Sequence, residues 1–157
     1  MTDVFSEEKR SYVMSCVSSK DTKPEKIVRS FLHRSGFRFR LHARDLPGKP
    51  DVVLAKHKTA IFVHGCFWHR HPGCKRTTTP KTRREFWVEK FKKNIRRDNL
   101  NYKKLKEQGW EVMVVWACKL EKIKSREEAL KNLVRTLTGL NVNSVDSAKK
   151  SECLLNL

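Results

Sequence analysis

The sequence predicts one α/β domain over residues 1–157, whose core has the order helix, three strands, helix, strand (αβββαβ) around a mixed central sheet and is followed by a C-terminal helix. Three observations predict it. Residues 51–55 and 59–63 are apolar, β-branched runs separated by three residues, which is typical of a hairpin. Three segments repeat apolar residues at helical spacing. A chain of 157 residues is long enough to bury a single sizeable core. The expected parts are an N-terminal arm (1–20), the core (21–120), and a C-terminal helix with a tail (121–157).

The first core helix is predicted to begin near Thr22 and to end before Gly36. Thr22 and Glu25 have the spacing of a capping box, and Pro24 falls in the first turn. The apolar residues on its inner face are Ile27, Val28, Phe31 and Leu32. Residues 6–17 can form a short basic helix, which we expect to act as an arm rather than as part of the core.

Four segments are predicted to be strands. Residues 37–41 alternate aromatic or apolar side chains with arginine, the pattern of a strand with one buried face. The hairpin of residues 51–55 and 59–63 follows, and residues 110–116 are the most hydrophobic strand. Asp51 heads its strand directly after a proline, so its carboxylate can ligate a hard cation. Most aspartates in Pro-Asp pairs are nevertheless solvated turn residues.

Two further helices are predicted from capping-box spacings, Thr82 with Glu85 and Ser125 with Glu128. The first of them is expected to continue to Gly109. Their apolar stripes are Phe86, Phe91, Ile95, Tyr102 and Leu105, then Ala129, Leu130, Leu133, Val134 and Leu137.

The composition points to a polyanionic partner. The chain has 35 Lys and Arg against 17 Asp and Glu, a net charge of +18, and such an excess most often neutralises phosphates. A merely basic, solvated scaffold is the alternative. No signal-peptide core is visible, and the longest apolar run is far shorter than the roughly 20 residues of a membrane helix. We therefore expect no membrane association and a cytoplasmic location.

A cluster of cysteine and histidine predicts a structural metal site. Cys66, His71 and Cys74 lie in one loop, and Cys118 follows the last strand, where it can return to that loop. Together they make a Cys3His set, which is typical of a closed structural zinc site. Two alternatives remain open: Cys118 can be an ordinary buried cysteine, and His69 can replace His71 as a ligand.

Several motifs together resemble one enzyme family. The segments LPGKPD, FVHGCFWH, EFWVEK, NIRRD and QGW, within residues 10–118, closely resemble the very short patch repair (Vsr) endonucleases. That family has a PD-(D/E)-x-K, restriction-endonuclease-like fold, whose core has the element order predicted here. The resemblance implies Mg2+-dependent nicking of double-stranded DNA, with one or two ions, 5′ to the mispaired thymine of a T:G mismatch. Such a nick starts the repair of deaminated 5-methylcytosine.

The resemblance also implies catalytic residues, namely Asp51, His69, Asp98, His64 and Glu25. Asp51 and the backbone carbonyl of Val63 would hold Mg2+, and the carbonyl stands where the wider superfamily has an acidic side chain. His69 would activate water and Asp98 would orient His69. Each role has a structural alternative: Glu25 as the capping-box acceptor, Asp98 in a surface ion pair, and His64 as a satisfied polar group.

A further set of residues is implied to contact DNA: Phe67, Trp68, Trp87, Lys90, Asn94 and Met14. In the family the aromatic residues of this set intercalate beside the mismatch, where unstacking costs less than in paired DNA. Core packing is the alternative for Trp87.

The leading hypothesis is thus a T:G mismatch endonuclease with catalytic Mg2+ and structural Zn2+. The alternatives are a catalytically inactive, zinc-stabilised DNA-binding module and a restriction-type nuclease that cuts paired DNA. Asp51, His69 and Asp98 together favour an enzyme. By resemblance we expect a monomer that is associated with the nucleoid. It would be linked functionally to a cytosine-5 DNA methyltransferase, and possible further partners are mismatch-repair proteins.

Overall fold

The computed structural model describes residues 8–9, 12, 16 and 20–139. Its elements are α2 (Lys23–Arg34), β1 (Arg40–Leu41), β2 (Val52–Leu54), the 3-10 helix η1 (Ala55–His57), β3 (Thr59–His64), α3 (Arg84–Glu107), β4 (Glu111–Trp116), the 3-10 helix η2 (Ala117–Leu120) and α4 (Ile123–Leu137). This confirms the predicted order of helices and strands. The arm helix predicted over residues 6–17 falls mostly outside the described residues, as do Met14 and the tail beyond residue 139.

The four strands form one mixed sheet in the order β1-β2-β3-β4. The pairs β1–β2 and β2–β3 are antiparallel, as expected for the hairpin. β3 and β4 are parallel over six residues, and α3 is the helix that connects them. No helix in the described ranges is both long and apolar enough to cross a membrane.

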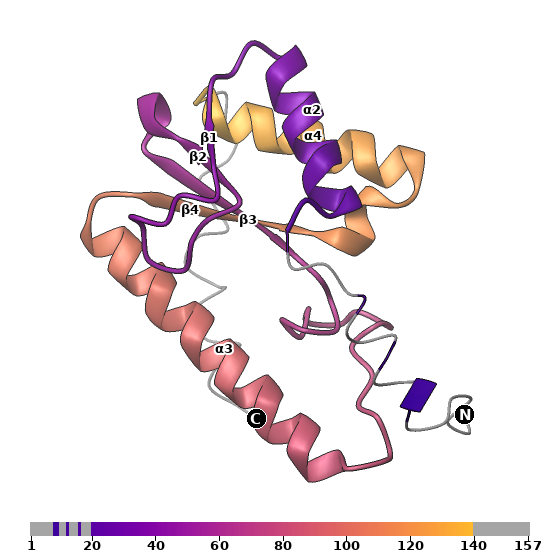
Figure 1. Cartoon of the computed structure of the whole chain (residues 1–157). Coiled ribbons are helices and arrows are strands. Elements are labelled where there is room, and N and C mark those ends of the chain that lie inside the picture. The colour runs from indigo at the N-terminus through magenta and orange to yellow at the C-terminus, as the bar shows by residue number, and fades with distance from the viewer. Residues whose placement is uncertain (1–7, 10–11, 13–15, 17–19, 140–157) are drawn as a thin grey trace.

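Helices cover both faces of the sheet: α2 and α4 lie on one side and α3 on the other (Figure 1). Successive side chains of β3 point alternately to the layer of α2 and α4 and to the layer of α3. Ile61 packs in the cluster that contains Leu32 of α2, whereas Phe62 packs with Leu105 of α3. Because side chains alternate along a strand, His64 emerges on the α3 side, two residues after Phe62. The end of β3 therefore directs a histidine at the long helix.

The strand predicted over residues 37–41 is much shorter in the structure, where only Arg40–Leu41 pairs. The backbone N–H of Phe37 donates to the carbonyl of Leu32 at 3.0 Å, and Gly36 has φ +84°. Phe37 thus belongs to the turn that ends α2. Phe37 is buried, as the alternating pattern predicts, whereas Leu41 on the same predicted face is 43% exposed.

Of the three predicted capping boxes, the structure contains the first. Thr22 caps α2 and Glu25 reciprocates. The other two predictions are wrong, because α3 follows Arg83, which has φ 52°, and α4 follows Lys122, and neither residue makes a side-chain cap. Ser125 instead lies inside the first turn of α4, where its hydroxyl donates to the carbonyl of Lys122 at 3.1 Å.

Candidate active site and metal centre

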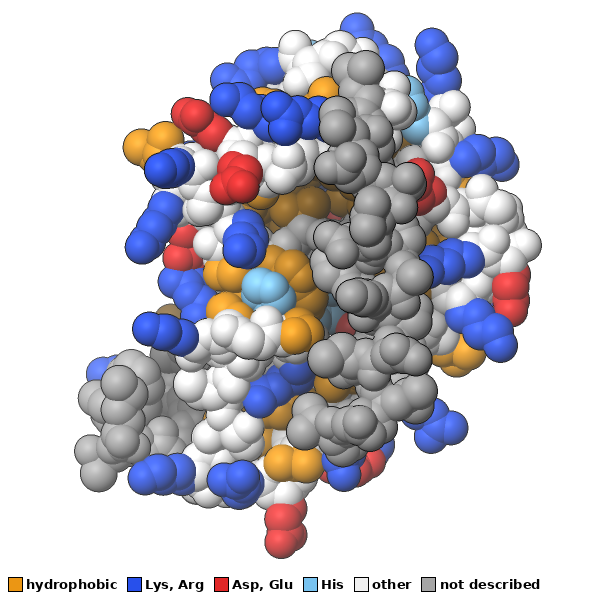
Figure 2. All heavy atoms as spheres, turned by 180° about the vertical axis from the view of Figure 1, so that it is seen from behind, with side chains coloured by type: hydrophobic (Ala, Val, Ile, Leu, Met, Phe, Trp, Pro, Cys, Tyr) orange, Lys and Arg blue, Asp and Glu red, His pale blue; other side chains and the backbone are white. Residues whose placement is uncertain are grey.

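A cleft of about 950 Å3 opens between the start of α2, the end of β3 and α3. The residues singled out from the sequence that line it are Glu25, Asp51, Val63, His64, Trp68, His69, Lys90, Asn94 and Asp98. They come from two helices, two strand ends and the loop after β3. The fold therefore brings the predicted catalytic side chains to one cavity, although they span 74 positions of the sequence, from residue 25 to residue 98. Lys and Arg side chains are spread over the face of the protein seen in Figure 2, mostly toward its edges.

Asp51 lies at the start of β2, against the end of β3. Its Oδ2 accepts a hydrogen bond of 2.7 Å from the backbone N–H of Val63. Burial raises the pKa of Asp51 above its usual value, the Val63 N–H opposes that shift, and the negative charge of Glu25 adds to it. A carboxylate in such surroundings is stabilised when a cation binds beside it.

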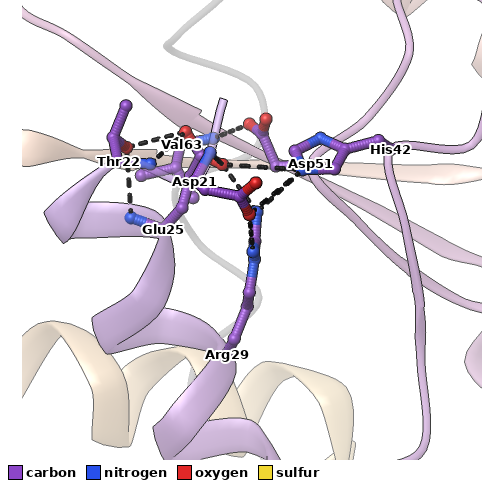
Figure 3. A network of polar contacts seen from close by, with 7 residues as sticks. All are labelled: Asp21, Thr22, Glu25, Arg29, His42, Asp51 and Val63. Atoms are coloured by element: carbon purple, nitrogen blue, oxygen red, sulfur yellow. Dashed lines mark hydrogen bonds and ion pairs between the residues drawn. The ribbon is translucent and has the colours of Figure 1, made fainter. Parts of the chain in front are cut away.

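Glu25 is almost fully buried, with 3% of its surface exposed, and both of its oxygens accept hydrogen bonds (Figure 3). Oε1 accepts from the Thr22 hydroxyl at 2.7 Å. Oε2 accepts from the Asp21 backbone N–H at 3.0 Å and from the Arg29 guanidinium at 2.7 Å. The structure thus contains the capping-box arrangement that was the alternative reading of Glu25. This anchored carboxylate forms one wall of the cleft.

Arg29 and His42 extend this network, and neither residue was predicted from the sequence. The Arg29 guanidinium pairs with Asp21 and lies 2.9 Å from Nε2 of His42. The backbone N–H of His42 donates to the carbonyl of Asp51 at 3.3 Å. Asp21, Glu25 and His42 have ligand atoms close enough for a metal ion, yet the guanidinium already supplies the positive charge among them. The spacing of Arg29 four residues after Glu25 was the available sequence signal.

His69 and Asp98 form a close pair across the cleft. Nδ1 of His69 is 2.5 Å from Oδ2 of Asp98, so that nitrogen carries the hydrogen. Burial raises the pKa of Asp98, but its hydrogen bond and charge interaction with His69 outweigh burial and keep the pKa below its usual value. Asp98 also pairs with the exposed Arg97 at 3.2 Å. The surface pair and the bond to His69 therefore coexist.

His64 lies directly against His69. The two imidazoles stack with ring centroids 3.6 Å apart and planes 5° from parallel. Nε2 of His64 is hydrogen-bonded to the hydroxyl of Tyr102 on α3. Burial, followed by the neighbouring charge of His69, lowers the pKa of His64 to about 3. Tyr102 was predicted only as part of an apolar stripe, so its polar contact is new information from the structure.

An aromatic cluster adjoins the cleft. Phe67 makes edge-on contacts with Trp68, Trp87 and Phe91, with centroids 5.1 to 5.6 Å apart. Trp87 is 8% exposed, so in this structure it packs as a core residue, as the alternative reading expected. Phe67 and Trp68 are half-buried. We call Phe67, Trp68, Trp87 and Phe91 the aromatic cluster.

Lys90 and Asn94, one turn apart on α3, hold the aromatic cluster from the helix side. Nζ of Lys90 lies 5.2 Å from the centre of the Trp68 ring, a cation–π contact. The Asn94 side-chain amide donates to the backbone carbonyl of Trp68 at 3.2 Å. Both side chains therefore reach the cleft beside Trp68.

A second group of residues has the geometry of a metal site. The ligand atoms of Cys66, His71, Cys74 and Cys118 all lie within 4.8 Å of one another. Nδ1 of His71 is 3.7 Å from the sulfur of Cys66 and 3.3 Å from that of Cys118. The structure groups His71 with the cysteines, whereas the near neighbours of His69 are Asp98 and His64.

The cysteine sulfurs interact strongly with one another. Burial, together with Cys66 and Cys74, raises the pKa of the Cys118 thiol to about 12, whereas the backbone N–H of Arg76 lowers that of Cys74. Clustered thiolates repel each other unless a cation joins them, so this donor set fits a metal ion. The rings of His71 and Trp116 stack with centroids 4.2 Å apart. Burial lowers the pKa of His71, which favours the neutral imidazole that binds a metal ion.

Comparison with known proteins identifies the family. The model of the DNA mismatch endonuclease Vsr family matches residues 2–76. The chain is 48% identical to the type II nicking enzyme V.XorIIP of Xanthomonas oryzae pv. oryzae, over 85% of this chain and 98% of that protein. It is 47% identical to the type II nicking enzyme V.NmeAIP of Neisseria meningitidis serogroup A, over 87% of this chain and 97% of that protein. Its identity to the Escherichia coli DNA mismatch endonuclease Vsr is 43%, over 83% of both chains. The chain therefore belongs to the Vsr family of DNA mismatch endonucleases and is a DNA-nicking endonuclease.

Proposed function

We propose that this endonuclease nicks double-stranded DNA 5′ to the mispaired thymine of a T:G mismatch in a reaction that requires Mg2+. The observation that carries the proposal is the shared cleft, in which Asp51 and the His69–Asp98 pair face one cavity next to the aromatic cluster. A pure DNA-binding module has no need of a carboxylate and an oriented imidazole in one cavity. The name of the Escherichia coli relative, a DNA mismatch endonuclease, supports the substrate class.

Asp51 and the carbonyl of Val63 are the proposed Mg2+ ligands, because carboxylate and carbonyl oxygens suit a hard cation. The raised pKa of Asp51 agrees with a carboxylate that gains from a cation. A divalent ion there supplies charge neutralisation for the scissile phosphate and its transition state. Glu25, whose oxygens are already bonded to protein donors, is proposed to keep the cleft wall in place and to add negative charge near the ion.

His69 is the proposed general base. Its Nδ1–H donates to Asp98, so Nε2 keeps a lone pair and can accept a proton from water. Asp98 holds the imidazole in that tautomer and stabilises the positive charge that forms on it, as an orienting carboxylate does. His64 is proposed to lie beside the phosphate and to support His69 through their stacked rings.

Phe67 and Trp68 of the aromatic cluster are the proposed wedge at the mismatch. Both are half-buried; Trp68 lines the cleft and Phe67 packs against it, and an inserted ring costs less at a mispair than in paired DNA. Trp87 is proposed to hold both rings in place through its contacts with Phe67 and Trp68. Lys90 and Asn94, which reach the same edge, are proposed to contact the mispaired bases.

We propose Zn2+ for the Cys3His site, with a structural role. A tetrahedral zinc ion binds sulfur at about 2.3 Å and nitrogen at about 2.0–2.1 Å, which sets ligand atoms about 3.5 Å apart. The distances from His71 to two cysteine sulfurs, 3.7 and 3.3 Å, are close to that value. With four protein ligands the ion keeps no open position, so its effect would be to tie the loop after β3 to the end of β4.

The remaining expectations stay predictions. They are a restriction-endonuclease-like single domain with a DNA-embracing N-terminal arm that includes Met14, a monomeric state, association with the nucleoid, and a functional link to a cytosine-5 methyltransferase and mismatch-repair proteins.

The test is a nicking assay on a duplex with one T:G pair, run with Mg2+ and with a chelator, for wild type and Asp51→Asn. Nicking by wild type only, and only with Mg2+, is the expected result. Binding without a nick by wild type would favour the inactive DNA-binding module. Equal cleavage of both strands of a paired duplex would favour a restriction-type nuclease.

A further inference from the structure

One face of α3 contacts both stacked imidazoles. Asp98 and Tyr102 are four residues apart, so their side chains are neighbours on that face. Asp98 is hydrogen-bonded to His69, and Tyr102 is hydrogen-bonded to His64. The stack between the two rings, 3.6 Å apart and nearly parallel, closes a four-residue ring of contacts. Such a ring restrains both imidazoles from the same helix.

The Tyr102 hydroxyl is suited to be the donor in its pair. Burial raises the pKa of Tyr102, so the phenol keeps its proton. The phenol ring packs on Phe62 with centroids 5.2 Å apart, which fixes its direction. When the hydroxyl donates to Nε2 of His64, the hydrogen of the neutral imidazole must lie on Nδ1. Tyr102 therefore selects one of the two tautomers of His64.

The stack matters because one hydrogen bond does not fix a ring plane. Asp98 anchors His69 at Nδ1, but an imidazole held at a single nitrogen can still rotate about that contact. The flat face of His64 removes this freedom, provided that His64 itself is held. His64 has tilted ring contacts with Phe62 and Trp116, and the hydroxyl of Tyr102 adds the hydrogen bond to its Nε2.

We propose that Tyr102 is a positioning residue for the nicking reaction: its hydroxyl holds His64 in one tautomer and one plane, and His64 holds the plane of His69. This inference rests on the proposed role of His69 as the general base. A base delivers its full effect only when its nitrogen points at the water that it deprotonates. In this role Tyr102 acts through His64 rather than directly on the DNA or on the attacking water.

The test compares Tyr102→Phe with wild type in single-turnover nicking of a T:G duplex. The variant keeps the ring contact with Phe62 and loses only the hydroxyl, so the thermal midpoint should change little. We expect a nicking rate about tenfold lower, with an unchanged Kd for DNA and an unchanged Mg2+ requirement. Lys103→Met, the next residue on α3 with a side chain 75% exposed, is the control and should keep the wild-type rate.

Two further readouts separate positioning from a general structural effect. In a His64→Ala background, Tyr102→Phe should cause no additional loss, because residues that act through one another are not additive. Nitrogen-15 NMR of the free protein should show the Nδ1-protonated form of His64 in wild type and a mixture of tautomers in Tyr102→Phe. A wild-type rate in Tyr102→Phe, additive losses, or an unchanged His64 spectrum would overturn the inference. An inactive wild-type protein would count against the proposed function, whereas the NMR comparison would still decide the role of Tyr102.

Discussion

Replacement of Arg29 by methionine should destabilise the wall of the cleft. Arg29 and Glu25 form an i,i+4 pair whose side chains are only 13% and 4% exposed. Methionine keeps most of the aliphatic volume and removes the charge. Glu25 is then left as a buried carboxylate without its cation.

The expected loss of stability depends on the hydrogen bonds that Glu25 keeps in the variant. Loss of one partner from a buried ion pair usually costs about 3–5 kcal/mol. Glu25 still accepts hydrogen bonds from Thr22 and from the Asp21 backbone, so we expect the lower end, about 3 kcal/mol. A typical domain has only about 5–15 kcal/mol of unfolding free energy. The change should therefore be large in a denaturation experiment.

The assay is equilibrium urea unfolding at pH 7, followed by tryptophan fluorescence. Lys93→Met is the matched control, because Lys93 and Glu89 also form an i,i+4 pair, with side chains 75% and 61% exposed. It should change the unfolding free energy by less than about 0.5 kcal/mol. The double variant Glu25→Gln with Arg29→Met should recover part of the loss, since it removes the buried charge. A cost below about 1 kcal/mol for Arg29→Met would show that the buried Glu25 does not depend on this guanidinium.

Three other predictions follow from the site. Asp51→Asn should abolish nicking yet raise the thermal midpoint of the metal-free protein at pH 7, because the raised pKa of Asp51 means that its ionisation destabilises the fold. That gain should shrink as the pH falls through the raised pKa and should be absent in thermal scans of acidic samples. Cys118→Ser should reduce bound zinc from about one ion per chain, measured by mass spectrometry, and lower the melting temperature. Phe67→Ala with Trp68→Ala should reduce the ratio of T:G to C:G nicking at least about tenfold while zinc content stays the same; an unchanged ratio would contradict the wedge.

The order of elements could be predicted because local patterns carry it. The runs on either side of η1 are apolar and β-branched, and they form the central hairpin. Element boundaries were less predictable. A capping-box spacing permits a capping contact but does not ensure one. The helices near Thr82 and Ser125 begin after Arg83 and Lys122 instead. Residues 37–41 form almost no strand pairing, since β2 is only three residues long, and Leu41 at the end of the predicted buried face is 43% exposed.

Within the site, the resemblance implied the contact of Asp98 with His69, and the capping-box spacing indicated that of Glu25 with Thr22. The other contacts that restrain the site residues were not predicted. His64 and Tyr102 are 38 residues apart, and their hydrogen bond depends on how α3 crosses the sheet. The same is true of Arg29 and His42, which meet only after the chain has turned back along β1. Such non-local polar contacts leave no periodic signal. The choice between His69 and His71 as the partner of the cysteines also needed the folded loop.

Mismatch-directed nicking can be tested by a strand-resolved measurement with purified wild-type protein and Mg2+. End-labelled duplexes that differ only in one T:G or C:G pair would be compared across several flanking sequences. A single nick 5′ to the mispaired thymine, absent from the paired duplex, is the predicted result. The absence of a nick at T:G in every context, or equal nicking of paired DNA, would contradict the account.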